Sequence, residues 1–253
     1  MTTTGGIEPQ VPAAKKKNVF SRVAGVLFAP AEAFGEIARR PDILAPLLLI
    51  VALGYVSTLL VVPRFDQDAY AAEQASEVLR KQPGTAAADA DRMGRVVAAS
   101  TKVGLWLAPL LTIVICAVMA GLYLFAFRLM AGEGTYTEAF SVMLYAWLPF
   151  AIGGIIMGIV VLARGSFSPM EAATLVKSNP AFLVDLKEQP ALFALLSSFD
   201  LFSVWMLVLL VFGFSAVSKL PRKTSAIIVL VLWVCYALVK TGGTALMASL
   251  TAP

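Results

Sequence analysis

Few side chains in this chain could do chemistry, and the two that stand out are charged residues beside or inside long apolar runs. Asp200 follows Ser197 and Ser198 at the edge of one run, and Lys240 interrupts the last run. Ionisable side chains at membrane depth are costly, so they mark functional or structural sites. Lys240 can carry its ammonium to the membrane surface on its long stem, or it can pair with Asp200. Asp200 can instead cap the helix that follows it.

Other catalytic and metal-binding patterns are missing from the sequence. Histidine is absent, which removes the commonest general base and metal ligand. Cys116 and Cys235 both lie in apolar runs, where cysteine behaves as a small buried hydrophobe. The nucleophile motifs G-x-S-x-G and S-x-x-K do not occur. We therefore predict no catalytic residue, no cofactor, no metal site and no enzymatic activity.

The composition is that of a membrane protein. Apolar residues make up 59% of the chain and charged residues only 14%, whereas about a quarter of an ordinary soluble domain is charged. No basic tract with interleaved aromatic residues suggests a nucleic-acid partner. The natural solvent for most of this chain is the bilayer.

Five apolar stretches have about the 20 residues that a membrane-spanning helix needs. Pro149 lies inside the third stretch and predicts a kink there. The pattern predicts an all-α membrane protein, a bundle of about five transmembrane helices. The expected spans are about 43–62, 103–127, 139–163, 201–217 and 226–246.

The chain before the first span has two parts. Residues 1–18 are polar and end in three lysines, which predicts a disordered basic tail. Residues 19–42 carry apolar side chains at rough helical spacing, interrupted by Pro30, and predict an amphipathic segment on the membrane surface. Basic side chains near anionic lipid contribute about 1 kcal/mol each. The expected lipid contacts are Lys15, Lys16, Lys17, Arg22, Arg39 and Arg40.

The connections between spans predict the orientation. We expect residues 64–102 to form two helices divided at Pro83-Gly84, and residues 164–198 to form short helices between prolines. Both connections are charge-balanced. The short connection 218–225 is basic and therefore cytoplasmic by the positive-inside rule. We expect a bacterial inner-membrane protein with a cytoplasmic N-terminus and its C-terminus outside.

Small residues in the third span predict close helix packing. Gly154 and Gly158 form a G-x-x-x-G pattern, which lets two helix backbones approach closely. The partner helix can belong to the same chain or to a second copy, and the sequence leaves both alternatives open.

Several stretches of the chain follow, in order and spacing, a pattern found in a known family of membrane proteins. The similarity begins in Leu27–Ile37 and continues in Gly132–Tyr136, which leads into the third span. The most specific stretch is Phe199–Trp205, followed by Gly213-Phe214 and Val217–Lys219. These stretches resemble the Yip family, whose eukaryotic members are named for binding Rab/Ypt GTPases. The resemblance reaches from about residue 19 to 245. It implies a five-helix bundle with a cytoplasmic N-terminus, of the bacterial branch, and it carries no catalytic residues.

Together these features predict a non-enzymatic scaffold, assembly or membrane-organising protein that binds a membrane-protein partner or a second copy of itself. The alternative is a small transporter or permease accessory subunit. The transporter alternative would depend on a polar site near Asp200 and Lys240. The spans are interrupted nearby, at Pro149 and at Gly242-Gly243.

Overall fold

The computed structural model describes residues 18–167, 176–186 and 188–250. Helices account for all the regular elements in these ranges, and a single bridge joins Phe65 to Phe167. The elements are α1 (Val19–Phe28), α2 (Pro30–Arg39), α3 (Leu44–Val61), η1 (Val62–Arg64), α4 (Gln67–Lys81), α5 (Ala87–Leu129), α6 (Tyr136–Ala146), α7 (Leu148–Arg164), η2 (Pro180–Leu183), α9 (Pro190–Leu196), α10 (Leu201–Ser218) and α11 (Arg222–Leu250).

Five helical stretches in the described part of the chain are long and apolar enough to cross a membrane. They are α3 with η1, α5, α6 with α7, α10 and α11. Helices suit this setting because they satisfy their backbone N–H and C=O groups internally, where a lipid environment offers no partners. The predicted fold class, an all-α bundle of about five transmembrane helices, is confirmed.

The third span is divided where the sequence places Pro149. Helix α6 ends at Ala146, and α7 begins at Leu148 with the proline in its first turn. Proline lacks an N–H, and the first turn of a helix tolerates that loss. The Trp147 amide donates to the Met143 carbonyl at 3.1 Å, so the chain changes direction at Trp147 without leaving this amide unpaired.

The predicted connection 64–102 is a helical hairpin that merges with the second span. Helix α4 and the start of α5 flank the turn at Pro83-Gly84, and α5 then continues unbroken for 43 residues. That length corresponds to about 65 Å, about twice the thickness of a bilayer core. The backbones of the hairpin touch at Gly94, where a Cβ would collide with the Ala71 carbonyl oxygen. The hairpin is therefore a packed extension of the bundle.

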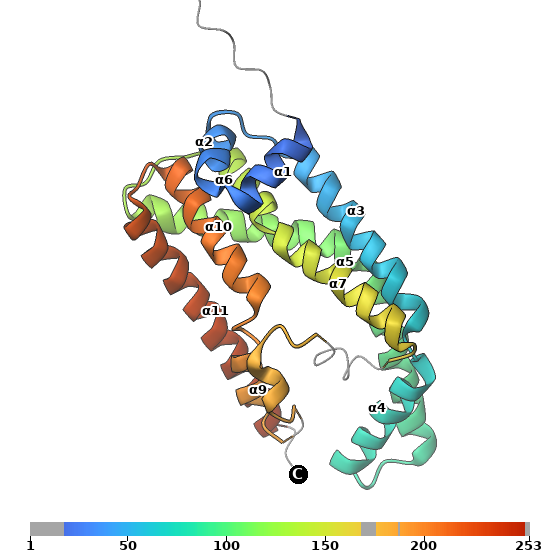
Figure 1. The fold of residues 1–253 in the computed structure, drawn as a ribbon. Coiled ribbons are helices and arrows are strands. Elements are labelled where there is room, and N and C mark those ends of the chain that lie inside the picture. The colour runs from blue at the N-terminus through green and yellow to red at the C-terminus, as the bar shows by residue number, and fades with distance from the viewer. Residues whose placement is uncertain (1–17, 168–175, 187, 251–253) are drawn as a thin grey trace, which may run out of the picture.

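The two ends of the molecule differ in their elements. Helices α1 and α2 lie at one end, and the α4–α5 hairpin, α9 and the C-terminal end of α11 lie at the other (Figure 1). Two short connections are joined to each other, because Lys219 Nζ lies 2.6 Å from Glu133 Oε2 and the Glu133 amide donates to the Ser218 carbonyl. The Glu133 carboxylate raises the pKa of Lys219.

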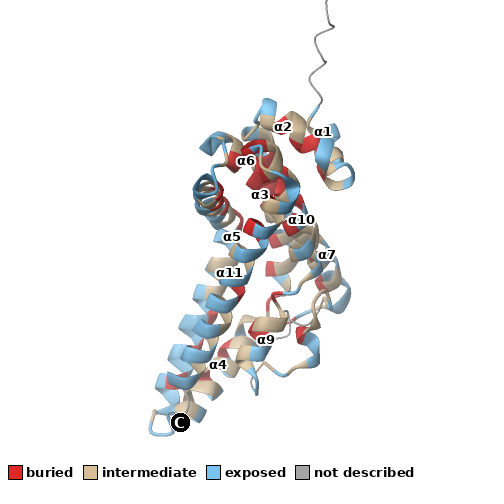
Figure 2. Cartoon of the chain, turned by 90° about the vertical axis from the view of Figure 1, so that its left-hand side faces the viewer, coloured by how far each residue is buried: buried red, intermediate tan, exposed pale blue. Residues whose placement is uncertain are grey.

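The main core lies near the end that carries α1 and α2, where the buried positions gather (Figure 2). Phe214 of α10 stacks on both Tyr123 and Phe127 of α5, with ring centroids 5.1 and 4.9 Å apart. Phe34 of α2 is completely buried in the same cluster. Stacked aromatic pairs add about 0.5–1.5 kcal/mol beyond the area they bury. The N-terminal helices thus share one core with the membrane spans.

The G-x-x-x-G pattern packs within the chain. Ser57 of α3 donates from Oγ to the Gly154 carbonyl at 2.8 Å, and a Cβ on Gly158 would lie 2.7 Å from Leu60 Cδ1. Of the two alternatives that the sequence leaves open, the structure shows close packing of α7 on α3 of the same chain.

Gly158→Ala should therefore destabilise the bundle, because the new methyl group overpacks the contact with Leu60. Overpacking costs about 1–3 kcal/mol, which thermal unfolding in detergent would show as a lower Tm. Gly104→Ala is the matched control, since a Cβ there meets nothing within 4 Å. An unchanged Tm for Gly158→Ala, together with a smaller oligomer, would place the glycine at an interface between copies instead.

Candidate functional site

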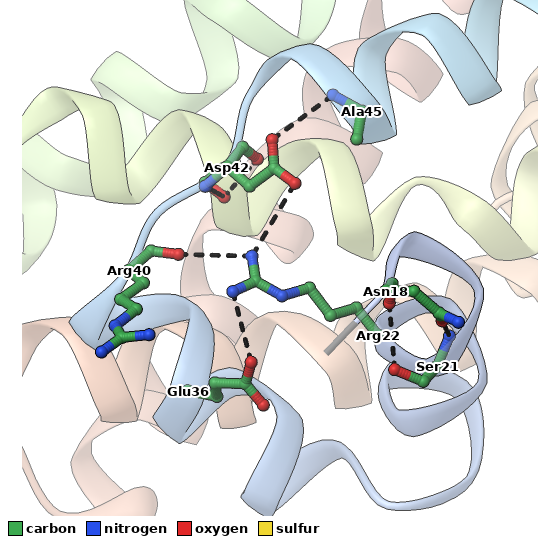
Figure 3. A network of polar contacts seen from close by, with 8 residues as sticks. Asn18, Ser21, Arg22, Glu36, Arg40, Asp42 and Ala45 are labelled. Carbon is green, nitrogen blue, oxygen red and sulfur yellow. Dashed lines mark hydrogen bonds and ion pairs between the residues drawn. The ribbon is translucent and has the colours of Figure 1, made fainter. Parts of the chain in front are cut away.

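The N-terminal helices are fastened to the bundle by Arg22 of α1, whose side chain is only 4% exposed. Its guanidinium lies 3.2 Å from a Glu36 carboxylate oxygen on α2 and 3.7 Å from a carboxylate oxygen of Asp42 (Figure 3). It also donates to the Arg40 carbonyl oxygen at 3.4 Å. A buried guanidinium needs such partners, because an unpaired charge away from water is strongly unfavourable.

Asp42 extends this network into the membrane spans. Its carboxylate accepts from the Ala45 amide in the first turn of α3. Its backbone forms two hydrogen bonds with Ser141 of α6: the Asp42 amide donates to Ser141 Oγ at 3.2 Å, and this hydroxyl donates to the Asp42 carbonyl at 2.9 Å. Arg22, Glu36, Asp42 and Ser141, which we call the Arg22 network, therefore join α1, α2, the start of α3 and α6.

The structure corrects one of the predicted lipid contacts. The sequence predicts Arg22 on the polar, lipid-facing side of the segment, but its side chain points inward and is buried. The reason is that Glu36 and Asp42, distant in sequence, supply two carboxylates on the inner side. The sequence contains one signal for the inward direction of Arg22. Arg22 and Val26 are four residues apart and so lie on one helix face, and Val26 is fully buried.

The remaining predicted contacts keep their surface positions or lie outside the described residues. Arg39 and Arg40 are exposed, although the Arg40 carbonyl belongs to the Arg22 network. Lys15, Lys16 and Lys17 lie outside the residues that the structure describes. Two aromatic side chains of α1, Phe20 and Phe28, are 79% and 83% exposed. The outer face of this end therefore combines basic and large apolar side chains.

A cavity of about 590 Å³ lies between α5, α6, α10 and α11. Both members of the predicted polar pair line it. Lys240 Nζ donates to Ser197 Oγ at 2.7 Å and to Ser198 Oγ at 3.3 Å. Asp200 caps α10 and accepts from the Phe202 amide at 2.8 Å. Of its two predicted roles, helix cap and partner of Lys240, the structure shows the cap.

Asp200 and Lys240 share this cavity without pairing. Among the described residues, no carboxylate oxygen lies within salt-bridge distance of Lys240 Nζ, and Asp200 Oδ2 accepts instead from the Ser178 hydroxyl. The N-terminus of α10 attracts the aspartate, because unsatisfied N–H groups there favour an anion. The two charges are therefore held separately, one by a helix end and the other by two hydroxyls.

A second cavity of about 350 Å³ lies between α3, α5 and α7. Two of its polar side chains are satisfied by backbone carbonyls: Ser57 bonds Gly154 and Thr58 bonds Leu105. No charged side chain among the described residues lines it. Its lining is mainly apolar with a few hydroxyls, whereas Asp200 and Lys240 line the larger cavity.

The fold and the network define a multi-span helical membrane protein whose N-terminal helices are part of its folded core. The chain matches the Yip1 domain over residues 24–241. It belongs to the Yip1 family, as the resemblance in its sequence indicates. It is also 27% identical over 210 residues to the membrane protein YknW of Bacillus subtilis (strain 168), covering 83% of this chain and 84% of that protein. No solved structure matches it significantly.

The match to the family includes the second half of α1 and all of α2. This extent agrees with the packing, because the two helices belong to the same core as the spans. The matched range also ends just beyond Lys240 and contains the whole Asp200 cap.

Arg22→Met should weaken the attachment of α1 and α2. Breaking a fully buried ion pair costs about 3–5 kcal/mol. We expect a smaller loss of about 2–3 kcal/mol here, because Glu36 and Asp42 are 22% and 26% exposed. Thermal unfolding of the purified protein would measure it. Arg39→Met, at an exposed arginine, is the control; equal Tm values for the two variants would contradict this role of Arg22.

Proposed function

We propose that this Yip1-family protein is a non-enzymatic scaffold of a bacterial inner membrane, which organises a membrane-protein partner at the surface formed by α1 and α2. The observation that carries the proposal is the Arg22 network. It fixes two amphipathic helices on the end of the bundle while their outer face stays exposed.

That outer face has the composition of a contact surface. Phe20 and Phe28 expose aromatic rings that a protein in water would bury, and exposed apolar groups of this kind mark protein or membrane contacts. Arg39 and Arg40, at the C-terminal end of α2, add exposed positive charge at the same end of the molecule. A rigid surface of mixed aromatic and basic side chains suits a partner that is itself held at the membrane.

Affinity purification of the tagged protein from native membranes in mild detergent would test the scaffold. We expect a stoichiometric membrane-protein partner, lost when Phe20 and Phe28 are both replaced by Ser. The matched control is Leu183→Ser, an apolar side chain that is 72% exposed at the opposite end of the molecule. Recovery of the wild-type protein without any partner would contradict the scaffold.

We further propose that the end carrying α1 and α2 faces the cytoplasm and that the C-terminus lies outside. The short connection between α10 and α11 holds Lys219 and is followed by Arg222 and Lys223. Connections rich in Lys and Arg stay on the cytoplasmic side.

Single cysteines at the two ends would test this orientation. In a background with Cys116 and Cys235 replaced by Ala, Gly84→Cys should react with a membrane-impermeant maleimide in intact spheroplasts. Lys223→Cys should react only after the membrane is permeabilised. The reverse labelling pattern would overturn the proposed orientation.

The proposal includes contact between anionic lipid and the basic side chains of residues 15–17, 39 and 40. Replacing all five with Gln should make proteinase K cleave the chain before α1 faster in anionic vesicles, because each charge contributes about 1 kcal/mol of attraction. In vesicles of neutral lipid the rates should be equal. A control carries Gln at Arg80, Arg92 and Arg95 in the far hairpin. If all variants are protected equally from proteinase K in anionic vesicles, the proposed lipid contact is wrong.

A second candidate function is a small transporter or permease accessory subunit, and the cavity that holds Asp200 and Lys240 favours it. Charged groups on discontinuous helices near the middle of a span are typical of transport sites. Solute uptake by vesicles containing the protein, lost in Lys240→Met, would support this candidate. Uptake equal to that of empty vesicles would exclude it.

A further inference from the structure

Lys240 is a cation without an anionic partner in the part of the chain that the structure describes. It lies in α11, a helix long and apolar enough to cross a membrane. Its ammonium has three N–H donors, and two of them go to the neutral hydroxyls of Ser197 and Ser198. Neutral acceptors orient a cation without cancelling its charge, so the site retains a net attraction for an anion.

Asp200 does not cancel this charge. Its Oδ1 accepts from the amides of Phe202 and Ser203, at 2.8 and 3.3 Å, and its Oδ2 accepts from the Ser178 hydroxyl. The aspartate is therefore committed to the N-terminus of α10, where the helix dipole offsets its negative charge. An anion entering the cavity finds the ammonium less satisfied than the carboxylate.

Away from these charges, the cavity wall is apolar and aromatic. A ligand there would lie against Tyr123, Met143, Trp147, Phe150, Met206 and Trp233. The volume of about 590 Å³ falls within the range of small-molecule sites, which is about 300–1,000 Å³. A cationic end joined to a long apolar wall complements a molecule with an acidic head and a hydrocarbon chain.

We infer that this cavity binds an anionic lipid of the surrounding bilayer, with the acidic head group at Lys240 and one acyl chain against the apolar wall. The bilayer is the source because α11 is long and apolar enough to cross it and because the lysine lies within this helix. The inference depends on neither proposed function: a scaffold can hold a structural lipid, and a transporter can carry one.

Quenching of tryptophan fluorescence by brominated lipids tests this inference. Trp147 and Trp233 line the cavity, so Trp106 and Trp205 are replaced by Phe to leave the two reporters. The full-length protein is placed in phosphatidylcholine vesicles that contain a minor fraction of either brominated phosphatidylglycerol or brominated phosphatidylcholine. We expect phosphatidylglycerol to occupy the site about fivefold more favourably, as one lysine near an anionic head group implies.

Variants at the lysine separate this site from general lipid contact. Lys240→Met should abolish the preference for phosphatidylglycerol, and Lys240→Arg should retain it. Lys102→Met is the matched control, because Lys102 belongs to α5, bonds Gln67 and does not line the cavity. Equal quenching by the two lipids in the reporter protein, or a preference that survives Lys240→Met, would overturn the inference. Displacement by free palmitate without any preference for phosphatidylglycerol would also overturn it, since the occupant would then be a free fatty acid.

Discussion

The placement of the N-terminal helices depends on one buried cation. The Arg22 guanidinium carries a charge into a nearly dry environment, and it is stable there only while Glu36 and Asp42 stay beside it. These three residues come from α1, α2 and the start of the first span, so the requirement fixes three segments at once. Ser141 transmits it to α6. Electrostatics thus sets a geometry that apolar contacts alone, which are not directional, would leave loose.

The apolar core and the Arg22 network support each other. Phe34 of α2 is completely buried, and its ring would meet a Cβ added to Gly213 of α10 at 3.2 Å. Such close approach requires the small residue at that position. The larger cavity begins at this core, because Tyr123 and Met143 line it, and it extends to Lys240 of α11. The bundle therefore combines a closely packed core with a cavity of about 590 Å³ beside it.

Local signals in the sequence predict much of this architecture, whereas the tertiary pairing of charges is beyond them. Three local features determine where helices form or end, because each affects only residues close to it in sequence. They are the length of the apolar runs, the missing N–H of Pro149 and the carboxylate of Asp200 at a helix start. The inward direction of Arg22 depends on carboxylates supplied by two other segments. The separation of Asp200 from Lys240 depends on Ser197 and Ser198 lying opposite α11. A hydropathy pattern contains neither fact.

Helices α1 and α2 belong to the folded domain and are held by protein contacts. Hydrogen–deuterium exchange of the full-length protein in nanodiscs of neutral and of anionic lipid tests this attachment most directly. The Arg22 network predicts slow exchange of the α1 and α2 amides in both lipids, because protein contacts must break before these helices open. Slow exchange only in anionic lipid, with fast exchange in neutral lipid, would show that the membrane alone holds them and would contradict attachment by protein contacts.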